Sequence, residues 1–320
     1  MAKALKTLVK AAAGAGAAYL ALGEIVYEGV INIDFNNFIR KTGWFDDKRI
    51  AEFYEKCTIL HEANDWYDEQ GCGDTVLMSQ RIGRNTFAKT YFPDEPSNKW
   101  ALLLHGYSDS PKDMAHFAMV YLSMGFNIVI PHMIGHGSDK SCYTSMGYYD
   151  RLIALDWIDY IVEKNPEAKI IVHGVSMGGA TTMMVTGEDL PSNVVAAVED
   201  CGYTSCWDEY ISQVGPMLHL APAAIPVVSA ANTVSRLRGN FNFKECSPLK
   251  AVVNSKTPTL FIHGEDDDFV PFEMVKTVYE ACGAPDKAMF TVPGALHAIS
   301  VYVDNEGYWK AVKEFIGKYI

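Results

Sequence analysis

The segment 169–180 constrains the fold more than any other part of the chain. Its sequence, KIIVHGVSMGGA, predicts a buried strand, a tight turn at Ser176 and then a helix. Gly174 and Gly178 stand two residues to either side of the serine. A side chain at either position would collide with the backbone of so sharp a turn. The pattern therefore predicts a nucleophile elbow, in which the Ser176 hydroxyl stands at the carboxyl end of a strand and faces the first N–H groups of a helix.

Apolar runs and amphipathic segments alternate along most of the chain. Buried strands are predicted at residues 100–104, 126–130, 170–172, 194–198, 258–262 and 287–292, with one or two edge strands at 81–92. Helices are predicted from Asp46 or Asp47 to about Gln70 and at residues 114–124, 149–164, 272–282 and 305–320. Such alternation predicts an α/β fold with a mostly parallel central sheet covered by helices on both faces.

The segment at about 203–251 interrupts this alternation. It contains aromatic residues, methionines and prolines but no strand-like run. Because it lies between two predicted strands, we expect it to be a helical cap over the carboxyl edge of the sheet and over Ser176. The organisation that follows is a hydrophobic segment at 1–23, a helical extension at 24–80 and an α/β domain at 81–320 that carries the cap.

The N-terminal segment allows three interpretations. Lys3, Lys6 and Lys10 precede a charge-free stretch of 13 residues at 11–23. That stretch is short for a membrane span, which needs about 20 apolar residues. A signal or signal anchor, an amphipathic helix on a membrane surface and a helix packed on the domain all remain open. Membrane association through residues 1–23, export and a cytoplasmic location are therefore all compatible with the sequence.

Charge and cysteine usage disfavour other classes of function. The net charge is −12 and no Lys/Arg cluster is present, which disfavours nucleic-acid binding. The seven cysteines show no C-x-x-C spacing, so the sequence predicts neither a zinc site nor a disulfide framework. We expect reduced thiols and no cofactor.

A serine nucleophile needs a base, and the base needs an orienting acid. His297 follows the last predicted strand and is the expected base. The loop after strand 258–262 offers three candidate acids, Asp266, Asp267 and Asp268, and the residues alone leave the choice among them open. Asp200, at the end of strand 194–198, is an alternative acid. The expected donors to an oxyanion are the backbone N–H groups of Met177 and Tyr107.

Four motifs together resemble the serine-dependent α/β-hydrolase superfamily. They are H-G-Y-S at 105–108, G-V-S-M-G-G at 174–179, H-G-x-x-D-x-x-V-P at 263–271 and G-x-x-H-A at 294–298. More narrowly, segments 155–160, 199–205 and 261–264 look like a group of bacterial α/β hydrolases and S33 serine aminopeptidase-like proteins. The resemblance implies an α/β-hydrolase fold and places the acid at Asp267.

One motif departs from the superfamily. A segment that is commonly D-x-R-G-H-G-x-S reads here as H-M-I-G-H-G-S, from His132 to Ser138. The usual aspartate and arginine brace loops, so we expect catalysis to survive the replacement by His132 and Ile134. His132 and His136 lack an accompanying carboxylate pattern, so we expect no metal there.

The expected function is hydrolysis of carboxylic esters through an acyl-Ser176 intermediate. The apolar, aromatic cap segment favours a small-molecule ester with an apolar acyl or aryl group. Alternatives are an aminopeptidase, in which Asp208 or Glu209 would hold the substrate amine, and an acyltransferase with the same triad. A catalytically silent binding protein is an alternative of another class.

Overall fold

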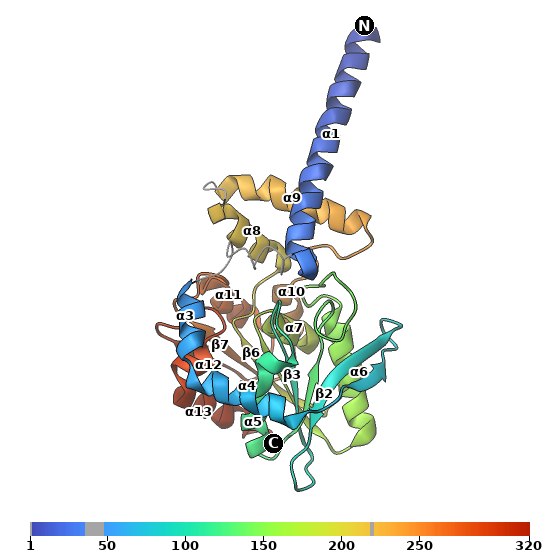
Figure 1. Ribbon diagram of the computed structural model, residues 1–320. Helices are drawn as coiled ribbons and strands as arrows, with labels where there is room; N and C mark the ends of the chain where they lie inside the picture. The colour runs from blue at the N-terminus through green and yellow to red at the C-terminus, as the bar shows by residue number, and fades with distance from the viewer. Residues whose placement is uncertain (1, 36–47, 218–220) are drawn as a thin grey trace.

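An eight-stranded sheet organises the protein (Figure 1). The computed structural model describes residues 2–35, 48–217 and 221–320, without the side chains of 2–13, 217, 221 and 223. The strand order is β1-β2-β4-β3-β5-β6-β7-β8. The strands are β1 Thr75–Met78, β2 Asn85–Tyr91, β3 Lys99–Leu104, β4 Asn127–Pro131, β5 Lys169–Val175, β6 Val194–Asp200, β7 Thr259–Gly264 and β8 Lys287–Val292.

The sheet is mostly parallel. Strands β3 to β8 pair in parallel, whereas β1 and β2 form an antiparallel edge that joins the sheet through β4. All carboxyl ends of the parallel strands therefore open onto one rim, where ligands bind in open α/β sheets. This architecture confirms the predicted α/β-hydrolase fold class.

Helices cover both faces of the sheet (Figure 1). They are α1 Ala2–Ile31, α3 Lys48–Lys56, α4 Thr58–Gln70, the 3₁₀ turn η1 Pro111–Met114, α5 Ala115–Ser123, α6 Asp150–Lys164, α7 Met177–Thr186, α8 Cys206–Met217, α9 Ala221–Leu237, α10 Pro248–Val252, α11 Glu273–Ala281, α12 Ser300–Val303 and α13 Asn305–Ile316.

The period-two pleat of β3 divides the core between the two faces. Leu102 packs with Trp157 of α6 and with α7 on one face. Leu103 packs with Tyr121 of α5 and with Trp309 of α13 on the other. The central strands are buried on both sides, which explains why they read as continuous apolar runs.

The N-terminal part of the sheet differs from the prediction. The predicted boundary at 80/81 falls between β1 and β2, which pair with each other, so the segment 24–80 contributes a strand to the sheet. The single helix predicted from Asp46 to Gln70 consists of α3 and α4, separated at Cys57 by extended backbone. Asp46 and Asp47, its expected caps, lie outside the described residues.

The cap consists of α8 and α9, with α10 at its end, and lies between β6 and β7 in the chain. It stands over the rim at which the parallel strands end (Figure 1). Pro216 and Pro226 lie inside α8 and α9. The aromatic residues that signalled a cap, Phe241 and Phe243 among them, are buried in its packing with the domain.

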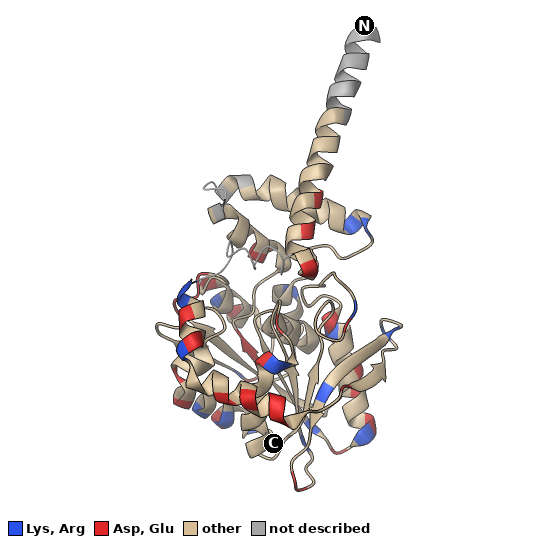
Figure 2. Ribbon diagram, viewed as in Figure 1, with Lys and Arg blue, Asp and Glu red and all other residues tan. Residues whose placement is uncertain are grey.

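The long helix α1 has two dissimilar halves. Its inner turns pack against α9, with Tyr27 and Ile31 buried, and Arg238 pairs there with Glu24 and Glu28. Residues 14–22 are exposed and project away from the domain, and the described part of this outer half carries no charge (Figure 2). The predicted boundary at 23/24 therefore falls inside one continuous helix.

Among the helices of the described chain, none is long and apolar enough to cross a membrane. The buried turns of α1 begin at residue 23, so the three interpretations of residues 1–23 all stay open. Membrane association through residues 1–23 stays a prediction.

Candidate active site

The turn at Ser176 has the geometry of a nucleophile elbow. Ser176 adopts φ 58° and ψ −116°, a strained conformation between β5 and α7. A Cβ on Gly174 would overlap the carbonyl of Gly178, and one on Gly178 would overlap the carbonyl of Leu104. The glycines are therefore required because other backbone segments occupy the space of their missing side chains.

The structure brings Ser176, His297 and Asp267 together. Ser176 Oγ lies 2.8 Å from His297 Nε2, and His297 Nδ1 lies 2.8 Å from Asp267 Oδ2. Since a carboxylate only accepts, Nδ1 carries the proton and Nε2 is left to accept from the serine. The three groups form the geometry in which imidazole can take the proton of the hydroxyl.

Asp267 is held by donors on both oxygens. Its Oδ1 accepts from the N–H groups of Phe269 and Val270 at 3.0 and 2.9 Å. Its Oδ2 accepts from His297 and lies 3.3 Å from His263 Nε2. Burial raises the pKa of Asp267, but the charge and hydrogen bonds of the two histidines outweigh it and hold this pKa well below its usual range. The carboxyl is therefore ionised at neutral pH.

The two expected oxyanion donors belong to segments next to Ser176. Met177 is the first residue of α7, so its N–H is among those that a helix leaves without an internal partner. Tyr107 belongs to the loop after β3, and this loop is close to the elbow, since a Cβ on Gly106 would be 3.5 Å from Ser176 Cβ. A role of these N–H groups as an oxyanion hole stays a prediction.

Two histidines that the sequence did not single out for this role hold the loop after β3. His136 Nε2 accepts from the N–H of Ser108 at 2.9 Å, and His105 Nε2 accepts from the N–H of Met133 at 3.1 Å. Burial lowers the pKa of His136 to about 4, so its ring is a neutral acceptor at pH 7. The sequence contains the G-H-G segment at 135–137. It does not show that His136 of this segment binds the backbone N–H of Ser108.

His132, which replaces the usual aspartate, also braces a loop. Its Nε2 donates to Asp74 at 3.1 Å and its Nδ1 accepts from the N–H of Ser138 at 3.0 Å. Within the described residues, the side chains close enough to share a metal ion are Cys201, Asp267 and His297. Because Asp267 and His297 bond to each other, we assign no metal to them.

Asp200, the alternative acid, is turned toward a different partner. Its Oδ2 accepts from Tyr308 at 3.0 Å, and Tyr308 in turn contacts His173 in a buried chain. Burial raises the pKa of Asp200 to about 6. Asp267, and not Asp200, is therefore the carboxylate that contacts His297.

The C-terminal end of α1 contacts both the loop after β3 and the cap. The Val30 carbonyl accepts from the hydroxyls of Tyr107 and Tyr210 at 3.2 and 3.3 Å, so one peptide group joins the loop after β3 to the cap. On the opposite side, the partly exposed ring of Phe269 lies 4.8 Å from that of His297.

The two cap carboxylates considered for amine binding differ. Asp208 accepts from Thr204 and Ser205 at 2.8 and 2.6 Å, so it has a structural role at the start of α8. Glu209 is buried, and its Oε2 has no hydrogen-bond partner in the described part of the chain. Burial, and then the charge of Asp267, raise the pKa of Glu209 well above its usual range.

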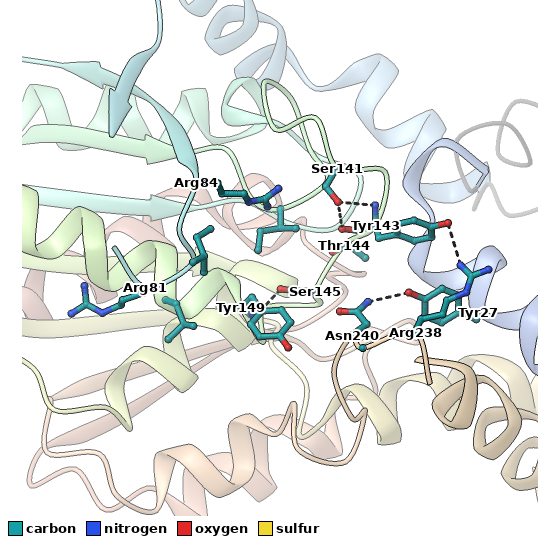
Figure 3. A pocket seen from close by; sticks show the side chains of 14 residues that line it. Tyr27, Arg81, Arg84, Ser141, Tyr143, Thr144, Ser145, Tyr149, Arg238 and Asn240 are labelled. Atoms are coloured by element: carbon teal, nitrogen blue, oxygen red, sulfur yellow. Dashed lines mark hydrogen bonds between the residues drawn. The ribbon is translucent and has the colours of Figure 1, made fainter. Parts of the chain in front are cut away.

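A cleft of about 760 Å³ opens beside the cap (Figure 3). Tyr27, Tyr143 and Tyr149 line it together with three arginines. Each arginine is paired with a carboxylate: Arg81 with Asp156 and Asp159, Arg84 with Asp139, and Arg238 with Glu24 and Glu28. None of the three triad side chains lines the cleft, although Thr144 in its wall contacts Met177 Sδ at 3.6 Å.

The sequence from residue 112 to residue 320 matches the prolyl oligopeptidase family. The chain belongs to this family. Prolyl oligopeptidase family members share the α/β-hydrolase fold described above, and the chain is a serine hydrolase of that superfamily.

Two Bacillus proteins are similar to this chain in sequence. The chain is 27% identical to the uncharacterized protein YqkD of Bacillus subtilis, over 67% of this chain and 70% of that protein. It is 23% identical to a thermostable monoacylglycerol lipase of a Bacillus species, over 68% and 90% of the two chains.

Solved structures show the same fold. An esterase of Pyrococcus furiosus superposes with a TM-score of 0.61 at 21% identity, covering 77% of this chain and 90% of that one. An acylaminoacyl peptidase of Pyrococcus horikoshii superposes with a TM-score of 0.56 at 18% identity, covering 80% of this chain and 43% of that one.

Proposed function

We propose that the protein hydrolyses carboxylic esters through an acyl-Ser176 intermediate. The observation that carries the proposal is the unbroken chain from Ser176 Oγ to His297 and Asp267, with both contacts at 2.8 Å. The named esterase and monoacylglycerol lipase among the similar proteins support the ester substrate.

The geometry supplies each proton transfer. Ser176 Oγ attacks the ester carbonyl carbon while His297 Nε2 takes the hydroxyl proton, and the carbonyl oxygen becomes an oxyanion beside the N–H groups of Met177 and Tyr107. The protonated His297 then gives its proton to the departing alkoxide as the C–O bond breaks. Water attacks the acyl-serine by the same steps, which releases the carboxylic acid and restores Ser176. Asp267 keeps the proton on Nδ1 throughout.

The substrate is expected to carry an apolar acyl or aryl group. The cap aromatics are largely buried in packing, so they give weaker support than their number in the sequence suggested. The better support is Phe269, whose ring is 40% exposed beside His297 and offers an apolar surface next to the reacting atoms.

Replacement of Ser176 by alanine tests the proposal. We expect turnover of p-nitrophenyl acetate to fall by at least about 10⁴-fold, as for other serine triads that lose their nucleophile. A fluorophosphonate probe should label the parent protein at Ser176 and leave the variant unlabelled. Equal hydrolysis by parent and variant would show that Ser176 is not the nucleophile.

A second candidate, an aminopeptidase, is favoured by one observation. The Oε2 of the buried Glu209 has no hydrogen-bond partner in the described part of the chain, and a substrate ammonium group bound there would favour the ionised, accepting form of this carboxyl. A panel of esters of varied chain length and of aminoacyl amides separates the two functions, because only an aminopeptidase requires a free amine. Glu209→Gln should then reduce turnover of amides and leave simple esters unaffected.

A further inference from the structure

A second imidazole contacts the catalytic acid. His263 is the penultimate residue of β7 and its side chain is fully buried. Its Nε2 lies 2.9 Å from the Val270 carbonyl and 3.3 Å from Asp267 Oδ2. Three members of the H-G-x-x-D-x-x-V-P motif therefore contact one another, because the turn after β7 folds the motif back onto itself.

The chemistry of these partners fixes a proton on His263. A carbonyl and a carboxylate both only accept hydrogen bonds, so Nε2 must be the protonated nitrogen. The one Nε2–H of His263 is therefore shared: it lies 2.9 Å from the Val270 carbonyl and 3.3 Å from Asp267 Oδ2, which also accepts from His297 at 2.8 Å. The two backbone N–H groups on Oδ1 complete the set.

The charges around His263 favour this arrangement. Burial alone would lower the pKa of His263, but the hydrogen bond and charge of Asp267 outweigh it and raise this pKa above its ordinary value. The other titratable groups that act on this cluster are Glu199 and Asp200 of β6, the catalytic His297 and Glu209 of α8. Burial raises the pKa of Glu199 to about 8, whereas the pKa of Asp267 is held well below its usual range. At neutral pH, Asp267 is therefore the charged carboxylate that acts on His263, and Glu199 is mostly neutral.

We propose that His263 is a positioning residue of the triad: its Nε2–H, together with the two backbone N–H groups on Oδ1, holds the Asp267 carboxylate in the orientation that faces His297. The inference rests on the proposed function, because it concerns the orientation of the same catalytic acid. Without His263, Oδ2 keeps only the His297 contact, and the two backbone N–H groups on Oδ1 are left to orient the carboxylate. His263 itself does not touch the reacting atoms.

Two substitutions separate positioning from packing. His263→Leu keeps an apolar body and removes the donor, whereas His263→Gln keeps an amide N–H near the place of Nε2. We expect the leucine variant to lose about 10- to 100-fold in kcat with little change in KM, the range for a slightly displaced catalytic group. The glutamine variant should recover most of that loss.

The pH profile gives a readout that a packing defect would not move. In His263→Leu, Asp267 loses a group that orients it toward His297 and therefore stabilises protonated His297 less. The acid limb of the kcat/KM profile should shift to lower pH. In His263→Gln, the limb should stay near its wild-type position.

His116→Leu is the matched control. His116 is also a buried histidine, but it lies on α5 and bonds to Asn305 and Trp309 of α13 rather than to a triad residue. Its replacement should lower the melting temperature without changing kcat or the pH profile. Fluorophosphonate titration gives the active fraction of every variant.

The unmodified protein offers a test that does not depend on folding of a variant. In ¹⁵N-histidine NMR, with the resonance assigned through His263→Gln, Nε2 of His263 should carry the proton. An unprotonated Nε2, or equal kcat losses in the leucine and glutamine variants, would overturn the inference. Full activity of Ser176→Ala would instead overturn the proposed function.

Discussion

Two aspartates lie at the carboxyl ends of neighbouring strands, and only one of them contacts the catalytic base. Asp200 is the last residue of β6, and Asp267 lies three residues beyond the end of β7. Both are close enough to His297 for its charge to act on them. Asp267 lies 2.8 Å from His297 Nδ1, whereas Asp200 accepts from Tyr308.

The difference lies in what directs each side chain. Asp200 is paired with Val175 and Ile262 in the sheet, so the pleat fixes the face to which it points. Asp267 is on a turn, where the N–H groups of Phe269 and Val270 rotate its carboxylate toward the rim. The rim of the sheet brings groups near each other, but the loop after a strand decides which of them meet.

The largest effect is expected at Asp267. Asp267→Asn should reduce kcat about 10⁴-fold, because an amide N–H facing His297 favours the wrong tautomer of the imidazole. The measurement is steady-state hydrolysis of p-nitrophenyl acetate, corrected for the active fraction. A loss of less than about tenfold would mean that Asp267 does not orient the base.

A much smaller effect is expected at Asp200. Asp200→Asn keeps an oxygen that accepts from Tyr308, and it changes no contact of His297. We expect kcat to fall by less than about tenfold, below the roughly 10²-fold cost of displacing a catalytic group by 1 Å. A loss as large as that of Asp267→Asn would make the two carboxylates a shared acid.

Stability should respond to pH with opposite signs at the two positions. Asp267 has a depressed pKa, so it stabilises the fold above its unfolded pKa, and that contribution is lost as the pH falls through the lower folded value. Its asparagine variant should therefore be less stable than the parent at neutral pH and approach it below about pH 4.

For Asp200, burial raises the pKa from 3.8 to about 6, so ionisation destabilises the folded state between these values. The stability of Asp200→Asn relative to the parent should accordingly rise from about pH 4 to about pH 6. Melting temperatures of both variants from about pH 2 to about pH 8 check these trends. Parallel curves for the two variants would contradict the assigned environments.

The features that sequence reasoning captured depend on short local patterns. At positions 174 and 178 the neighbouring backbone leaves no room for a Cβ, so both residues must be glycine. The two glycines are visible in the sequence and therefore predict the turn. The alternation of apolar runs and helices reports the parallel sheet. The position of His297 follows from the same sheet, since it comes just after the last strand, whereas the choice of Asp267 among its neighbouring aspartates depends on the family motif at 263–271.

The features that were missed depend on partners distant in the chain. Strand β1 is only four residues long and its apolar Val76 and Met78 are exposed, so its short apolar run does not indicate a buried strand. His136 and His105 hold a loop through backbone N–H groups, which leave no trace in sequence spacing. The contact of α1 with α9 requires both helices to be placed before it can be seen.

The packing of α1 on α9 has a consequence for how the protein is made. The inner turns of α1 leave the ribosome first, yet their partner α9 is translated only after six strands of the sheet. At about 5–20 residues per second, the early helix waits for seconds without its intramolecular partner. The contact between α1 and the cap therefore forms late in synthesis. Until then, Tyr27 and Ile31 of the nascent chain lack the partner that buries them.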